Sequence, residues 1–415
     1  MGDKKKAVHK TNSPVRGKTN VRKKTKRQKL IRGLLIAICV VTVVCIVAVV
    51  GGFFLIQHYI NKTNYVADND VTTLAAEEIS SILAEESESK VYYTQVEQTN
   101  EAGEVQTNEA GEIIYETVEL DLSKLTPEQI ESLESSAEAE YSSAEAAQAQ
   151  LQNISIIGSS DVYNILLIGV DVRAGSNWNG NSDSMILLSI NRAKGIIYMT
   201  SFMRDTYVAI PGVGSYKLNR AHAVGGGPLL CQTVEQNFRI KVDAYARVNF
   251  YNMIDIIDAI GGVDLTISAD EARVANNYIN EICNGVGLTP SDYYVSEGSQ
   301  HMNGVQAVAY CRIRYVGSDY ARTQRQRTVL TLMFQKLMTM DLGQINNFLN
   351  TALPLVTHNI PSDVLTSLVL NVPTYLTYGI EQMRVPFDGA FTSQNDDLVP
   401  NYEYTITRLQ QTIYY

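Results

Sequence analysis

The sequence predicts an α/β protein: a single α-β-α sandwich domain outside a membrane, preceded by one transmembrane helix and a stalk that is disordered or partly helical. From about residue 159, apolar strand-like runs alternate with helix-like stretches, as in a sheet covered by helices. A charge-free apolar stretch precedes this region, and an acidic low-complexity stretch separates the two. We therefore expect a basic tail, a transmembrane helix, a stalk and a folded domain, at residues 1–32, 33–58, 59–158 and 159–415.

The charges divide the chain in the same way. Residues 1–32 hold 13 Lys and Arg against one acid, residues 61–158 hold 3 against 21, and residues 159–415 hold 18 against 22. The basic tail could contact nucleic acid or anionic lipid, but no folded DNA-reading element accompanies it. Control of membrane topology is therefore the favoured interpretation, and no nucleic-acid partner is expected.

The stretch Leu34–Ile56 predicts an uncleaved membrane anchor. Its 23 residues carry no charge and would form a helix about 35 Å long, against a hydrocarbon core of roughly 30 Å. A cleaved signal peptide is the alternative, but its apolar region is usually only ~7–15 residues long, and no small-x-small cleavage site follows. Because Lys/Arg-rich flanks stay in the cytoplasm, we expect a single-pass plasma membrane protein whose residues 57–415 lie outside the cell.

The acidic stretch 59–158 predicts a spacer between membrane and domain. It contains two copies of an eight-residue repeat, QTNEAGEV and QTNEAGEI, and low hydrophobicity with high negative charge favours disorder. One part predicts a helix, because Thr126 can act as its cap and Pro127 suits the first helical position.

The folded domain begins with three strands. NILLIGVD is a continuous apolar run, typical of a buried strand, and the next two strands are joined through Arg192–Lys194 as a hairpin. A helix with Pro228 in its first turn, a strand, a helix ended by glycine and a further strand follow. The expected elements are Asn164–Asp171, Ser184–Asn191, Gly195–Asp205, Gly227–Phe238, Val242–Phe250, Phe250–Gly262 and VDLTI.

Five arginines gather in CRIRYVGSDYARTQRQR, residues 311–327. The alternation in Ala307–Val316 predicts a strand, which would place Arg312 and Arg314 on one face. After a break, Asp319 can cap a helix. The spacing within that helix places three side chains on one side: Arg322, Arg325 and Gln326. Arg327 would point away from them and be solvated.

Further charged residues lie at strand ends, where ligand sites gather in sheets covered by helices. These are Asp171, Asp183, Arg204 and Asp205. Arginine forks match phosphate oxygens, and aspartates can hold Mg²⁺, with Mn²⁺ as a substitute, while phosphate and water complete its coordination. The pattern favours a polyanion that carries a divalent cation. A surface salt-bridge network is the alternative, although each exposed pair stabilises by only ~0–1 kcal/mol.

The external cysteines predict no metal site. Cys231, Cys283 and Cys311 lack metal-ligand spacing. We expect three buried thiols, with one disulfide and a free thiol as the alternative.

The domain resembles the LytR-CpsA-Psr (LCP) family of Gram-positive bacterial envelopes. The matching segments occur in family order over about residues 161–335, with a weaker match at Thr377–Phe391; they are NILLIGVD, SDSMILLSIN, MTSFMRDTYVAIPG, YKLNRAHAVGGG, VNFYNMIDIIDAIGGVDL and HMNGVQAVAYCRIRY…DYARTQRQRTVL. The resemblance implies an α-β-α fold with a long apolar pocket for a polyprenyl chain. It also implies Mg-dependent transfer of a glycopolymer, teichoic acid-like or capsular, from a polyprenyl-diphosphate carrier to peptidoglycan.

The resemblance also assigns residues. Asp171 and Asp183 match the metal-linked aspartates, and Arg325 matches a helix arginine of less certain role. The diphosphate-binding residues would be Arg204, Arg312, Arg314, Arg322, Arg325 and Gln326; the catalytic set would be Asp171, Asp183, Arg204, Arg312 and Arg322. Asn181 stands where the family often has Arg, and Met203 where it usually has Pro.

The implied reaction is phosphoryl transfer with release of polyprenyl phosphate, and either Asp171 or Asp183 could accept the proton. Alternatives are a non-catalytic polyprenyl-diphosphate receptor and a membrane-bound transcription attenuator.

Overall fold

The computed structural model describes part of the chain: residues 57–68, 76–84, 93–97, 99, 105, 115–119, 124–170, 180–314, 316, 318–394 and 397–415. The chain divides into two compact units, Met1–Gln57 and His58–Tyr415, and the elements below belong to the second. The basic tail and nearly all of the expected transmembrane helix lie outside the described residues. Within the described ranges, every helix is too short or too polar to span a bilayer.

A mixed seven-stranded sheet forms the centre of the domain, in the order β1-β12-β9-β4-β5-β6-β13. Its middle is the antiparallel trio β4, β5 and β6, while β9 and β13 run parallel to β4 and β6. The predicted strands and the hairpin between β5 and β6 are confirmed. The bounds are β4 Val162–Val170, β5 Ser182–Asn191, β6 Ile196–Phe202, β9 Ala244–Asn249, β13 Gly379–Val385, β12 Thr357–His358 and β1 Asn64–Tyr65.

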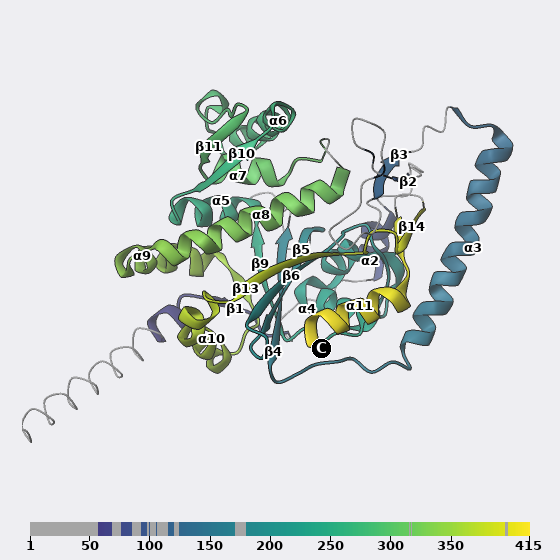
Figure 1. Cartoon of the computed structure of the whole chain (residues 1–415), viewed down its shortest axis with the longest axis horizontal. Coiled ribbons are helices and arrows are strands. Elements are labelled where there is room, and N and C mark those ends of the chain that lie inside the picture. Colours follow the sequence, from purple (N-terminus) through teal and green to yellow (C-terminus); the bar gives the residue numbers. More distant parts are fainter. Residues whose placement is uncertain are drawn as a thin grey trace, which may run out of the picture. The chain divides into compact units, whose positions relative to one another are not determined.

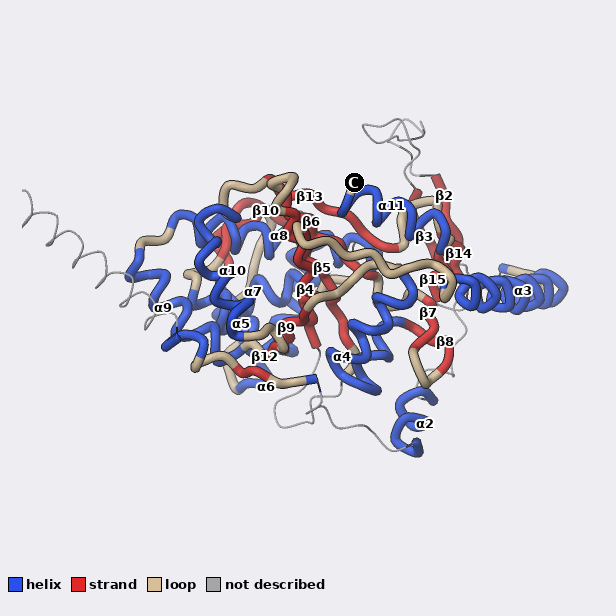
Figure 2. The backbone as a smooth tube through the Cα atoms, turned by 90° about the horizontal axis from the view of Figure 1, so that it is seen from below, coloured by secondary structure: helices blue, strands red, loops and turns tan. Residues whose placement is uncertain are grey.

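Helices cover both faces of the sheet, as the predicted sandwich requires (Figures 1 and 2). On one face α4 (Leu218–Phe238) and α11 (Tyr402–Tyr414) pack on strand residues such as Leu166 and Leu187. On the other face lie α8 (Ser318–Thr339) and α10 (Ser362–Tyr375). The predicted helix after Gly227 is confirmed but starts earlier, so Pro228 lies inside α4, beyond a kink at Gly225 and Gly226.

A second core lies beside the sheet and is built mainly from helices. Its two strands pair only with each other, so the predicted strand VDLTI is confirmed but lies outside the main sheet. The elements are α5 Phe250–Ala259, β10 Val263–Ile267, α6 Ala269–Val286, β11 Gly298–Met302, α7 Gly304–Cys311 and α9 Leu342–Ala352.

The strand predicted over Ala307–Val316 is wrong. Residues up to Cys311 form α7, whose cap Asn303 accepts from the backbone of Gln306, and a loop follows. Nearly every α7 residue is buried, and a short apolar run that is buried on all sides does not distinguish a helix from a strand. Arg312 therefore ends a helix, and Arg314 lies in the loop.

The predicted helix after Thr126 is confirmed as α3 (Pro127–Leu151), with a reciprocal cap between Thr126 and Gln129. Its residues Ala144 and Leu151 pack with Tyr402. The residues that follow the expected transmembrane helix also pack on the domain: β1 (Asn64–Tyr65) pairs with β12. A free spacer is therefore the wrong description for these two parts of 59–158.

Smaller elements complete the described chain. They are α2 Ala76–Ala84, β2 Tyr93–Glu97, β3 Tyr115–Glu119, β7 Tyr207–Ile210, β8 Gly214–Lys217, η3 Pro290–Asp292, η4 Leu353–Leu355, β14 Phe391–Gln394 and β15 Asp397–Pro400.

Close packing of α5 and α7 fixes the part of the fold that carries Arg312. A Cβ on Gly304 would lie 2.2 Å from the backbone oxygen of Ile254. We expect Gly304→Ala to lower the free energy of unfolding by about 1–3 kcal/mol, as overpacking does. Gly343→Ala is the control, because only the tip of Asp341 is near, at 3.2 Å. Urea denaturation that finds equal stability for both variants would contradict this packing.

Candidate functional site

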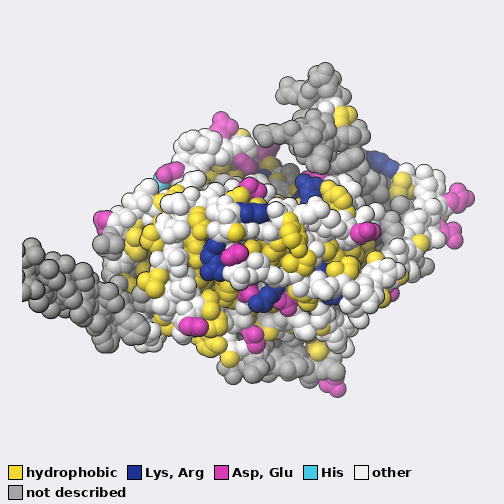
Figure 3. All heavy atoms as spheres, turned by 60° about the horizontal axis from the view of Figure 1, so that its bottom comes forward, with side chains coloured by type: hydrophobic (Ala, Val, Ile, Leu, Met, Phe, Trp, Pro, Cys, Tyr) yellow, Lys and Arg dark blue, Asp and Glu magenta, His cyan; other side chains and the backbone are white. Residues whose placement is uncertain are grey.

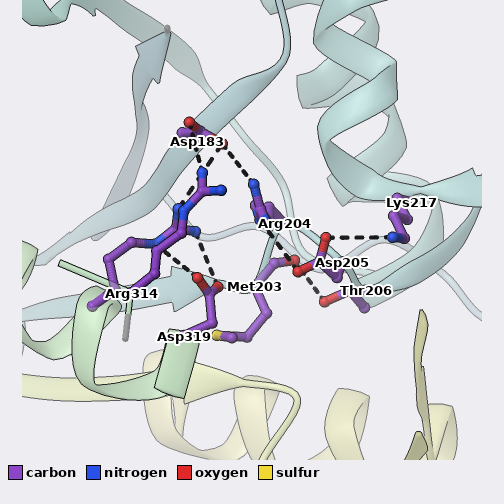
Figure 4. Close-up of polar contacts among 9 residues, drawn as sticks. Asp183, Met203, Arg204, Asp205, Thr206, Lys217, Arg314 and Asp319 are labelled. Carbon is purple, nitrogen blue, oxygen red and sulfur yellow. Dashed lines mark hydrogen bonds and ion pairs between the residues drawn. The ribbon is translucent and has the colours of Figure 1, made fainter. Parts of the chain in front are cut away.

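A β-bulge presents Asp183 to the face of the sheet that α8 covers. Gly169 pairs with Ser184, and the next residue, Val170, pairs with Ser182, so the register skips Asp183. A bulge leaves its extra residue outside the ladder and redirects that side chain. Figure 4 shows the result: Asp183 points toward a group of arginines.

Three arginines from separate elements surround the Asp183 carboxylate. Arg204 Nη1, just after β6, lies 3.2 Å from Oδ1, and Arg314 Nη2, in the loop after α7, lies 3.1 Å from Oδ2. Arg322 Nη1, in the first turns of α8, lies 4.0 Å from Oδ1. The Arg322 side chain is only 2% exposed, so solvent screens its charge little.

The charges control the protonation of this cluster. Burial by itself would raise the pKa of Asp183, but Arg314, Arg322 and Arg204 outweigh it and hold that pKa below its ordinary value. Burial lowers the pKa of Arg322. Burial also acts to lower the pKa of Arg204, but the neighbouring carboxylates outweigh burial and raise the pKa of that guanidinium.

Two further aspartates orient the arginines. Asp319 Oδ2 accepts a hydrogen bond from Arg322 Nη2 at 3.0 Å, and Oδ1 lies 2.8 Å from Arg322 Nε as an ion pair. Asp205 accepts from Arg204 Nε at 3.2 Å, and its other oxygen lies 3.8 Å from Lys217 Nζ. Burial raises the pKa of the Asp319 carboxyl, and Arg322 opposes that shift. Sequence reasoning treated Asp319 only as a cap, although its spacing to Arg322 suits an i,i+3 ion pair.

A small pocket of about 110 Å³ opens beside Asp183, which is below the roughly 300–1,000 Å³ typical of sites that enclose a whole small molecule. In it the Arg312 guanidinium lies 5.2 Å from the ring centre of Phe250 and 5.0 Å from that of Tyr278, and Arg312 Nη2 donates to Glu281 at 3.0 Å. The contacts with the rings and Glu281 restrict the position of Arg312. The lining residues are Asp183, Phe250, Tyr278, Cys311, Arg312, Arg314, Arg322 and Gln326.

Most of the predicted site residues with described positions meet here. Asp171 lies outside the described residues, and its assignment stays a prediction. Arg325 faces away from the pocket, contrary to its assignment to the diphosphate: its Nε lies 2.9 Å from Glu271, and its other nitrogens donate to the carbonyls of Ile313 and Val316. It thereby fixes the loop that carries Arg314.

The prediction of a solvated Arg327 is wrong, because this residue is 5% exposed. Its Nε donates to Gln382 on β13 at 3.2 Å. Burial and the nearby Arg384 lower the pKa of Arg327 to about 10. Helical spacing gives the direction of a side chain but does not show that β13 covers that side of α8.

The pocket suits a magnesium ion bound together with phosphate, but it holds no all-protein cage. Among the residues with described positions, no three His, Cys, Asp or Glu side chains group as metal ligands. Mg²⁺ commonly takes only one or two carboxylates and completes its coordination with phosphate oxygens and water. The Asp183 carboxylate fits that pattern.

The cysteines do not supply a nucleophile here. Cys231, Cys283 and Cys311 are all free thiols, as predicted, but of the three Cys283 alone is fully buried and the other two are partly exposed. Cys311 lines the pocket, but burial raises its pKa to about 12. The reactive thiolate is therefore scarce at neutral pH.

Replacing Asp183 by Asn should destabilise the domain by roughly 2–4 kcal/mol at pH 7, because three guanidinium groups lose their shared counter-charge. The pKa of Asp183 is lower in the folded state than the ordinary ~3.9. Its stabilisation is therefore present above about pH 4 and lost as pH falls through the folded-state pKa. Urea unfolding at several pH values should show the gap between native chain and variant closing in acid.

Asp264→Asn is the matched control, because Asp264 forms an exposed pair with His301 and should change stability little. If the stability gap between the native chain and Asp183→Asn stays constant down to acid pH, the assigned charge interaction is contradicted.

Several known proteins are similar to this chain. The LytR_cpsA_psr family model matches residues 128–413. The transferase named polyisoprenyl-teichoic acid–peptidoglycan teichoic acid transferase TagU, from Bacillus cereus, is 31% identical over 56% of this chain and 71% of its own length. Biofilm regulatory protein A of Streptococcus mutans is 34% identical over 45% of this chain and 47% of its own length, so the chain spans about half of that relative.

Among solved structures, one titled "TagT bound to LI-WTA" is 26% identical, with a TM-score of 0.48 over 61% of this chain and 90% of that chain. The family model covers more than half of the sequence, including the strands, α7 and α8 that form the pocket. The chain therefore belongs to the LytR_cpsA_psr family.

Proposed function

We propose that this domain binds the diphosphate of a polyprenyl-linked glycopolymer, teichoic acid-like or capsular, and transfers the glycopolymer to peptidoglycan. The observation that carries the proposal is the convergence of Arg204, Arg314 and Arg322 on Asp183 beside an open pocket. The name of TagU, the relative from Bacillus cereus, describes the same kind of reaction.

The chemistry of the pocket favours a diphosphate. Arginine binds phosphate oxygens with paired donors and keeps its charge at physiological pH. Arg312 and Gln326 add donors to the same pocket. A diphosphate would compete with Asp183 for the guanidinium groups, and it offers more oxygen acceptors than one carboxylate does.

The adjoining face of the sheet offers apolar surface for a polyprenyl chain. On the α4 side, Leu166 and Leu187 have no exposed surface. On the α8 and α10 side, Tyr163, Leu167 and Leu188 remain half-buried. These half-buried side chains lie on the face toward which Asp183 points, and this placement supports the proposal of an apolar chain held next to the diphosphate.

The proposed reaction is attack by a sugar hydroxyl of peptidoglycan on the phosphorus next to the glycopolymer. A new oxygen–phosphorus bond forms, the bond to the bridging oxygen breaks, and polyprenyl phosphate leaves with the electron pair. The arginines stabilise the negative charge on the bridging and leaving oxygens. The hydroxyl proton passes to a base that we do not assign, because a lowered pKa makes Asp183 a weak proton acceptor.

Mg²⁺, or Mn²⁺ in its place, is the proposed cofactor, and Asp183 with Asp171 would hold it. When bound, it would supply further positive charge to the phosphate oxygens. The expected anchor would keep the domain on the outer side of a bacterial plasma membrane, where the lipid carrier and peptidoglycan are both accessible.

A transfer assay tests this proposal. With labelled lipid-linked polymer, peptidoglycan and Mg²⁺, Arg314→Gln should lower the transfer rate by roughly 10²–10³-fold, the usual effect of losing one stabilising donor. Arg314 is suitable because it is 35% exposed and its replacement should leave the fold intact. Arg273→Gln, on the exposed side of α6, is the matched control and should transfer normally.

The products separate the proposal from its main alternative. A receptor would bind the lipid tightly without attaching polymer or releasing polyprenyl phosphate, and that result would exclude the transferase. Chelation of divalent cations should stop transfer, and Mg²⁺ should restore it. Full activity under chelation would remove the metal from the proposal while leaving the arginine cluster in place.

A further inference from the structure

Helix α10 carries large apolar residues on its outer side as well as on its inner side. Its sequence, SDVLTSLVLNVPTY, contains one charged residue, Asp363. Val364, Leu365 and Leu368 pack toward the sheet. A surface helix of a soluble domain normally carries polar residues opposite its packed stripe, so α10 departs from the usual pattern.

The outer residues of α10 form an exposed apolar patch. Val369 is 38% exposed, Leu370 63% and Val372 43%. Met338 of α8 is 45% exposed and lies one helical turn after Phe334, which packs in the same cluster as Leu368 of α10. Figure 3 shows apolar side chains reaching the surface on the lower face of the domain, with some Lys, Arg, Asp and Glu side chains among them.

The start of the domain ties this patch to the expected membrane anchor. The anchor's apolar stretch ends at Ile56. Tyr59 is already 8% exposed, and its hydroxyl donates to Asn346 of α9. Three residue steps reach at most about 11 Å, so an anchor that spans the bilayer and ends at Ile56 would leave Tyr59 only a short length of chain from the membrane.

The edge of the sheet continues from Tyr59 to α10. Tyr65 of β1 pairs with His358 of β12, and Val66 donates to the His358 carbonyl at 2.9 Å. Helix α10 begins four residues after His358. Tyr65 is itself 52% exposed, and tyrosines are common where a protein meets a membrane interface.

We propose that the outer side of α10, centred on Leu370, rests in the interface of the bilayer to which the chain is anchored. The proposal relies on the membrane anchor in the proposed function. This contact of α10 with the bilayer would hold the half-buried apolar face of the sheet near the lipid from which a polyprenyl chain must come. Because the patch is uncharged, contact should need neither anionic lipid nor low salt.

A single-tryptophan experiment tests the contact. The chain has one tryptophan, Trp178, so Trp178→Phe provides a background for Leu370→Trp. Full-length chain is reconstituted into phosphatidylcholine vesicles whose acyl chains carry bromine, a short-range quencher of tryptophan. The matched control is Gln411→Trp, at an exposed position on α11, which packs on the opposite face of the sheet.

We expect several-fold stronger quenching at position 370 than at position 411, unchanged between about 0.1 M and about 1 M salt. Equal quenching at the two positions would overturn the proposal, as would quenching that high salt removes. A blue-shifted but unquenched signal at position 370 would instead indicate a second copy covering the patch and would also overturn it. If the chain does not co-float with the vesicles in a density gradient, both the anchor and the α10 contact are excluded. The transfer assay tests the proposed reaction independently of this result.

Discussion

The site depends on one carboxylate shared by three guanidinium groups. Arginines brought this close repel one another unless an anion lies between them, and Asp183 supplies that anion. The bulge in β5, the turn after β6, the loop after α7 and the start of α8 each deliver one part of the arrangement. A ligand that replaces the carboxylate has to be an anion with several oxygens, and this requirement favours a diphosphate.

The supporting contacts hold the pocket residues in position for a ligand. Arg325 is committed to Glu271 and to two loop carbonyls, so it holds Arg314 in place without reaching the pocket itself. Asp319 holds Arg322 through both oxygens. Because these contacts are already formed, little reorganisation should be needed when charge develops in the reaction.

The sequence was most informative where one pattern has one structural meaning. Long apolar runs predicted β4, β5 and β6, and polar residues at their ends located Asp183 and Arg204. It was least informative for α7, because its buried residues lack a polar side that would reveal a helical period. The burial of Arg327 by β13 and the pairing of Arg325 with Glu271 join residues 55 and 54 positions apart, and local spacing carries no information about such contacts. The family resemblance gave the correct family, yet it assigned Arg325 by motif position alone.

The most direct test of the central claim is to compare binding of a polyprenyl diphosphate with binding of the matching polyprenyl alcohol, by titration calorimetry on the purified chain. The two ligands share the apolar tail and differ in the group that the arginines should recognise. The account predicts that the diphosphate binds at least about tenfold more tightly, since even one charge-assisted hydrogen bond contributes about 1.5–3 kcal/mol. Equal affinities would show that the arginine cluster around Asp183 does not recognise the diphosphate, and would contradict the account.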